Sequence, residues 1–80
     1  MLVCQLARGA RTCCFSIRDT RGQGWELTEE RDRRTVRTVR YTDWHRVELA
    51  ATLISLEVAA LEREGWTVTR GSSWFNESVP

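Results

Sequence analysis

Residues 42–65 read TDWHRVELAATLISLEVAALEREG, and this stretch decides the fold. It has no glycine or proline before Gly65, and Thr42 or Asp43 can cap a helix at its start. Gly65 can end the helix in a left-handed conformation, which glycine adopts easily. The stretch therefore predicts one long helix over about residues 43–64, roughly 33 Å in length at about 1.5 Å per residue.

Two apolar faces follow this predicted helix at about 100° per residue. The first is broad enough to pack on a sheet, and its members are Trp44, Val47, Ala50, Ala51, Ile54, Val58 and Leu61. The second lies on another side of the helix and consists of Leu49, Leu53, Leu56 and Ala60. One sheet shelters one face, and an exposed leucine forgoes about 1.5–3 kcal/mol of burial. We therefore predict that the second face, called the leucine face below, packs against another chain, most simply the same helix of a second copy in a dimer.

Two arrangements within one chain would cover the leucine face instead. In the first, the sheet curls around the helix. In the second, the aromatic residues of the C-terminal region fold back over the leucines; these are Trp66, Trp74 and Phe75. Either arrangement would remove the reason for a dimer.

The end of the predicted helix carries charges that the helix dipole disfavours. Glu62 and Glu64 lie beside the negative pole, and Arg63 offsets them only in part. We expect an arginine from the sheet or from a partner chain to supply the rest.

Turn signals before the helix divide residues 2–42 into four strands of an antiparallel meander. Gly9 and Ala10 suit a two-residue hairpin loop with glycine in the first position. This loop places Cys4 opposite Phe15, so that one face of the hairpin is apolar and the other is small or polar.

The segment DTRGQ predicts a second hairpin, with a three-residue loop in which Gly22 takes the left-handed conformation. In this register Trp25 lies opposite Ile17, and Leu27 lies opposite Phe15. The apolar face of the first hairpin is thereby continued.

The third hairpin turns near Asp32, and two registers compete for it. A three- or five-residue turn sets Trp25 opposite Tyr41 and Glu26 opposite Arg40, whereas a two-residue turn sets Trp25 opposite Arg40. Aromatic and opposite-charge pairs contribute about 0.2–1 kcal/mol each, which favours the first register.

After the helix, residues 66–70 alternate as a short fifth strand, and residues 72–80 form a tail. The predicted fold class is α+β, with a single domain over residues 1–71. The predicted core comprises Leu2, Cys4, Leu6, Phe15, Ile17, Trp25, Leu27, Val39, Trp44, Val47, Ile54, Val58 and Leu61.

Composition limits the possible partners and compartments. The 12 basic and 11 acidic residues give a net charge of +1, which argues against strong non-specific attraction to nucleic acid or anionic lipid. No run approaches the ~20 apolar residues of a membrane span, and the N-terminus lacks the features of a secretory leader. The cysteines, Cys4, Cys13 and Cys14, are odd in number and lack the spacing of zinc ligands. We therefore expect a cytoplasmic protein with reduced thiols and no membrane partner.

The sequence predicts no catalytic, cofactor-binding or metal-binding residues. His45 is the only histidine, and it projects from the polar flank of the helix. A single histidine without further ligands or an orienting group supports neither a metal site nor a catalytic triad. We expect a protein without enzymatic activity and without a cofactor.

A polar sheet face with arginines is the remaining candidate surface. Arginines and hydroxyl groups can contact phosphates, and the candidate residues are Arg18, Arg37, Arg40 and Arg70. Acidic neighbours on the strands offer a different use for these arginines, since opposite charges pair across strands.

The element order over residues 2–64, four antiparallel strands followed by one long helix, resembles Whirly-type and positive-cofactor-type single-strand-binding proteins. This resemblance is one of topology, without a shared sequence motif, and it implies dimers or higher oligomers. It makes single-stranded nucleic acid the alternative partner. The residues themselves favour a self-associating, non-catalytic interaction module that binds another macromolecule.

Overall fold

The strands and the helix follow one another in the predicted order. The structure, a computed structural model, describes residues 2–71, so that Trp74 and Phe75 lie outside the described residues. The elements are β1 (Leu2–Arg8), β2 (Arg11–Asp19), β3 (Trp25–Arg31), β4 (Arg34–Tyr41), α1 (Trp44–Arg63) and β5 (Thr67–Gly71). They form one antiparallel sheet in the order β4-β3-β2-β1-β5. The predicted α+β fold class, with its meander, long helix and short fifth strand, is confirmed.

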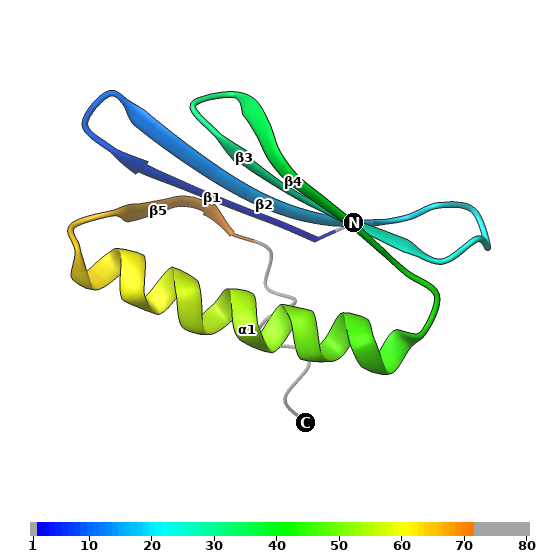
Figure 1. Cartoon of the computed structure of the whole chain (residues 1–80). Helices are drawn as coiled ribbons and strands as arrows, with labels where there is room; N and C mark the ends of the chain where they lie inside the picture. The colour runs from blue at the N-terminus through cyan, green and yellow to red at the C-terminus, as the bar shows by residue number, and fades with distance from the viewer. Residues whose placement is uncertain (1, 72–80) are drawn as a thin grey trace.

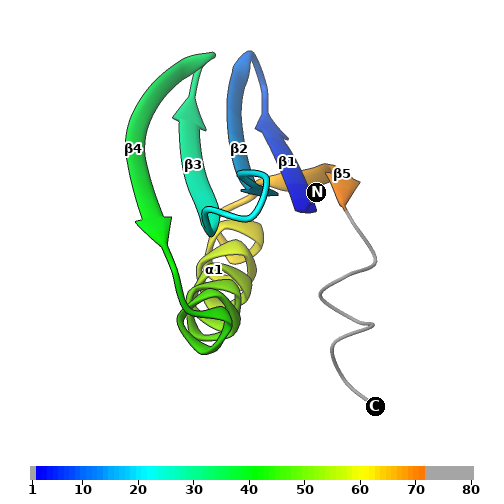
Figure 2. The same ribbon diagram turned by 90° about the vertical axis from the view of Figure 1, so that its right-hand side faces the viewer.

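The molecule has two layers. Figure 1 shows α1 running along one face of the sheet, and Figure 2, which looks along the helix, shows β5 beside β1 at the edge opposite β4. Among the described residues, no element covers the other face of the sheet. The core between the layers contains Cys4, Leu6, Cys13, Phe15, Ile17, Leu27, Val47, Ala51, Ile54, Leu61 and Trp66.

Both ends of α1 are capped by the residues that the sequence indicated. At the start, a side-chain oxygen of Asp43 accepts a hydrogen bond from the backbone N–H of His45 at 2.9 Å. At the end, Gly65 has a φ of 99° and its N–H donates to the carbonyl of Glu62 at 3.1 Å. The N–H of Trp66 donates to Leu61 at 3.0 Å, which turns the chain back toward the sheet.

The first hairpin has the predicted register. Cys4 lies opposite Phe15 and Leu6 lies opposite Cys13, and all four side chains are buried beneath the helix. The alternation of side chains along the strands therefore predicted correctly which residues of β1 and β2 face the helix.

The predicted register of the second hairpin is wrong by two residues. Ile17 pairs with Leu27 instead of Trp25, and Phe15 pairs with Glu29. The reason is a longer loop: both the N–H and the hydroxyl of Thr20 donate to the carbonyl of Gly24 at 2.9 Å, so pairing resumes only after that residue. A shift of two residues preserves the faces of a strand, and Leu27 is therefore still buried.

The third hairpin reaches the predicted register by a different route. Trp25 lies opposite Tyr41 and Glu26 lies opposite Arg40, as expected. The turn itself has two residues, Asp32 and Arg33, whose φ values of 52° and 68° are those of a type I′ turn. A bulge between Glu29 and Glu30 then corrects the pairing along the rest of the ladder.

One member of the predicted core is exposed. Trp44 is 40% exposed because it is the first residue of α1 and packs at the end of the sheet, with its ring centroid 5.2 Å from that of Trp25. Trp25, Val39 and Val58 are partly buried against the core. Three residues that the predicted core lacked, Cys13, Ala51 and Trp66, are fully part of it.

Gly24 is the glycine whose replacement by another residue the fold tolerates least. Its φ is +105°, and a Cβ atom there would collide with the carbonyl oxygen of Tyr41. We expect Gly24→Ala to lower the free energy of unfolding by about 3 kcal/mol or more, measured by denaturant unfolding. Gly22→Ala is the matched control, because Gly22 has a φ of +83° but open space around it, and about 1 kcal/mol is expected. Equal losses in the two variants would contradict the close contact at Gly24.

Candidate functional site

The leucine face points away from the sheet. Leu49, Leu53 and Leu56 are 64%, 61% and 64% exposed, and Ala60 in the same row is half-buried. The helix is held in this rotation because Val47 and Ile54 on its other side are buried in the core. The structure thus brings the four predicted residues together along one line of α1.

Neither of the two alternatives covers the leucine face within the described residues. The sheet packs on the opposite side of α1 and leaves the three leucines exposed. Trp66 is 8% exposed and belongs to the core cluster. The leucine face therefore forms an open, apolar surface on this part of the chain.

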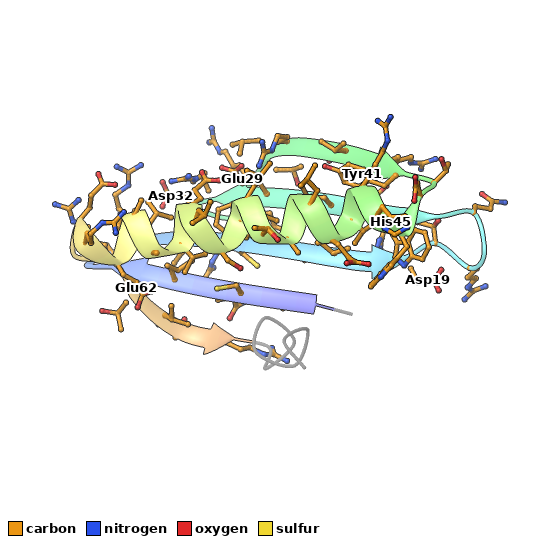
Figure 3. The ribbon with its side chains drawn as sticks, turned by 90° about the horizontal axis from the view of Figure 1, so that it is seen from below. Asp19, Glu29, Asp32, Tyr41, His45 and Glu62 are labelled. Carbon is orange, nitrogen blue, oxygen red and sulfur yellow. The ribbon has the colours of Figure 1, made fainter. Side chains whose placement is uncertain are left out.

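Charged residues at the two ends of α1 lack ion-pair partners among the described residues. Arg46 stands in the first turn of α1, and Glu62 and Glu64 stand at its last turn, as Figure 3 shows for Glu62 at the end opposite His45. No ion pair joins any of these three to another of the residues in the range 2–71. An arginine of the sheet was one of two expected partners for this end of α1. Arg8 of β1 does lie there, since a Cβ atom on Gly65 would be 3.9 Å from its Nε atom. It forms no ion pair with Glu62 or Glu64 among the described residues.

Three of the four candidate phosphate-binding arginines form ion pairs with carboxylates. Arg18 and Arg40 lie on the outer face of the sheet and both contact Glu26, at 3.0 and 3.3 Å. Arg37 lies on the helix side instead and contacts Glu29 at 3.1 Å. The alternative interpretation, in which these arginines serve cross-strand ion pairs, is confirmed for all three.

Glu29 is the centre of a charged cluster of which the sequence predicted only the cross-strand pair with Arg37. It is only 9% exposed, and it binds Arg31 at 3.0 Å as well as Arg37. Arg31 also reaches Glu57 of α1 at 3.6 Å. Burial lowers the pKa of Arg31, but the hydrogen bond with Glu29 and the charges around it outweigh burial and raise that pKa. Arg31 therefore stays charged and links β3 to the helix through Glu57.

Arg70, the fourth candidate, borders a shallow hollow on the outer face of the sheet. It lies in β5 opposite Gln5. The hollow has a volume of about 460 Å³, and its lining includes Gln5, Thr12, Cys14, Ser16, Arg33 and Arg70. Hydroxyl, amide and guanidinium groups make this surface a hydrogen-bonding one. The sequence signal for it is the run of small side chains on the outer positions of β1 and β2.

The thiol in this hollow is not activated as a nucleophile. Burial raises the pKa of Cys14 and the nearby Glu30 raises it further, against weaker opposite effects of Gln5 and Arg70. Burial also raises the pKa of Cys4, and it raises the pKa of Cys13 to about 11. The thiolate is the reactive form of cysteine, so all three thiols are poorly reactive at neutral pH.

The described residues contain no group of three or more histidine, cysteine, aspartate or glutamate side chains that would hold a metal ion. His45 is exposed in the first turn of α1. The helix in residues 2–71 is not apolar enough over a sufficient length to cross a membrane.

No protein-family model, no curated protein and no solved structure matches this chain. The arguments about function therefore rest on the surfaces described above.

The cysteine pKa values predict an alkaline loss of stability. Cys13 has a pKa of about 11 in the folded chain and an ordinary value of 9.0, so the folded state keeps its proton where the unfolded state loses it. The free energy of unfolding should hence fall as the pH rises from about 9 to about 11. Thiolate absorbance against pH checks this: it should rise later in the folded protein than in guanidinium chloride. Superimposed titration curves would contradict the burial of these thiols.

Proposed function

We propose that this chain is a self-associating interaction module without catalytic activity, which packs the leucine face of α1 against a second copy. The observation that carries the proposal is the exposure of Leu49, Leu53 and Leu56, at 61–64%, in one row with Ala60. The poorly reactive, reduced thiols fit a cytoplasmic setting, which is part of the same proposal.

The spacing along the row suits packing between two helices. The leucine face repeats at intervals of four, three and four residues, which is the seam spacing of a short coiled coil. The small side chain of Ala60 at one end allows the helix backbones to approach closely. The seam from Leu49 to Ala60 takes up about three turns of the 20-residue helix.

The energy available is of the size that a reversible dimer needs. A dimer would bury six leucines that are each about two-thirds exposed, which yields roughly 6–12 kcal/mol. Association costs about 4–15 kcal/mol in lost translational and rotational freedom, which offsets much of this gain. We therefore expect a weak, reversible dimer that forms at high micromolar concentration, with the outer face of the sheet left free for another macromolecule.

A charge in the centre of the leucine face should prevent the dimer. We expect Leu53→Glu to be monomeric in sedimentation equilibrium at about 100 μM and still helical by circular dichroism, because a carboxylate cannot be buried unpaired in an apolar seam. Ser55→Glu is the matched control, since Ser55 lies on α1 outside the leucine face, and it should leave the dimer intact.

Two outcomes would contradict the proposed function. One is a wild-type chain that stays monomeric at this concentration. The other is a Leu53→Glu variant whose oligomer has the same size as that of the wild type.

Binding of single-stranded nucleic acid is the alternative, and the observation in its favour is the hollow between Arg33 and Arg70. If phosphates bind there, the affinity for single-stranded DNA falls steeply between about 50 and about 200 mM salt. Arg70→Ala should then weaken binding more than Arg40→Ala, because Arg40 is already paired with Glu26 and does not line the hollow. Fluorescence anisotropy with a labelled oligonucleotide measures both effects. Weak binding that both variants leave unchanged would remove this alternative.

A further inference from the structure

We infer that the second copy packs on the leucine face in the antiparallel orientation, with Arg46 of each copy paired to the partner's Glu64. This inference rests on the proposed function and adds the orientation and the polar contacts that select the partner. It follows from the placement of charges on α1.

Arg46 and Glu64 each lie beside the pole of their own helix dipole that disfavours their charge. Arg46 is a cation in the first turn, beside the positive pole, and this turn holds no acidic residue. Glu64 is an anion at the C-cap, beside the negative pole. Neither is ion-paired within the described part of the chain. Each charge is therefore disfavoured in the isolated subunit and gains from a partner that brings the opposite charge or the opposite pole.

The two charges are also placed symmetrically beside the leucine face. They are 18 positions apart in the sequence, which is five turns at about 3.6 residues per turn, so they lie on the same flank of the helix. Arg46 precedes Leu49 by three residues, and Glu64 follows Ala60 by four. Arg46 and Glu64 thus lie beyond the two ends of the leucine face, at nearly equal distances from the midpoint of that face.

A two-fold axis through that midpoint, perpendicular to the helices, brings these charges together. Such an axis reverses the helix direction and keeps the flank, so that Arg46 of one copy meets the partner's Glu64, and the reverse contact forms as well. Both charges then lie beside the opposite pole of the neighbouring helix. The antiparallel pair thereby gives Glu64 an ion-pair partner, which Arg8 of the described sheet, although it lies beside Gly65, does not.

In the parallel orientation, only one of the two charges gains a partner of opposite sign. In that orientation, the same positions along the two helices lie side by side. Glu64 then meets the partner's Arg63, while Arg46 lies beside the partner's His45 and the positive pole of the partner's helix. Arg46 would remain without a carboxylate. The antiparallel orientation is therefore the one that the charges favour.

Charge reversal separates the orientations. We expect Arg46→Glu and Glu64→Arg each to raise the dissociation constant of the dimer about tenfold at low salt, because two symmetry-related attractions become repulsions. The double variant should return to within about threefold of the wild type, since the pairs form again with exchanged signs. Sedimentation equilibrium of the full chain measures all four constants.

A weakened helix cannot explain these losses. Each single reversal moves a charge of the preferred sign to its own pole, so the isolated helix becomes more stable, which thermal unfolding followed by circular dichroism should show. Weaker association in a more stable subunit therefore reports on the contact between copies.

The outcomes distinguish this inference from the proposed function. If the wild type dimerises, Leu53→Glu is monomeric and the double variant shows no recovery, the leucine face is the interface but the antiparallel pairing is wrong. If Arg46→Glu has no effect while Glu64→Arg weakens the dimer, the helices are parallel and the inference is overturned. A monomeric wild type overturns both.

Discussion

The packing of Val47, Ala51 and Ile54 against the sheet is the interaction on which the rest of the structure depends. It fixes the rotation of α1 about its own axis, and this rotation directs the leucine face outward. The contact between Arg31 and Glu57 holds the same rotation from the side of β3. Within the described residues, the five-stranded sheet packs against one face of the single helix. The leucine face of α1 is left exposed.

The fold could be predicted from the sequence because its signals are local and agree with one another. Capping residues defined α1, and the alternation of side chains defined the faces of the strands. The register of the second hairpin was missed for a physical reason: a shift of two residues leaves the buried face unchanged, so alternation cannot detect it. The loop length was decided instead by the Thr20 contacts to Gly24, which depend on three-dimensional closure.

The candidate site was predictable mainly in its helical part. Helical period alone places Leu49, Leu53 and Leu56 together, and the structure leaves them exposed. For the arginines of the sheet, the predicted register of the third hairpin gave two carboxylate partners correctly, Glu26 for Arg40 and Glu29 for Arg37. The second arginine on each carboxylate, Arg18 on Glu26 and Arg31 on Glu29, was not predicted. The hollow beside Arg70 arises from residues on β1, β2 and β5 and from a turn, which no single segment indicates.

The bulge in the third hairpin affects how the sheet can grow. β4 is an outer strand, and within the described chain its only strand neighbour is β3. An unprotected outer strand can recruit further chains into fibrils. Here Val36 is the unpaired residue of the bulge, and arginines stand on both sides of the strand, at Arg34, Arg37 and Arg40. Local distortion and repulsion between like charges therefore oppose runaway strand addition. In the proposed dimer, association through the helix instead ends at a closed pair.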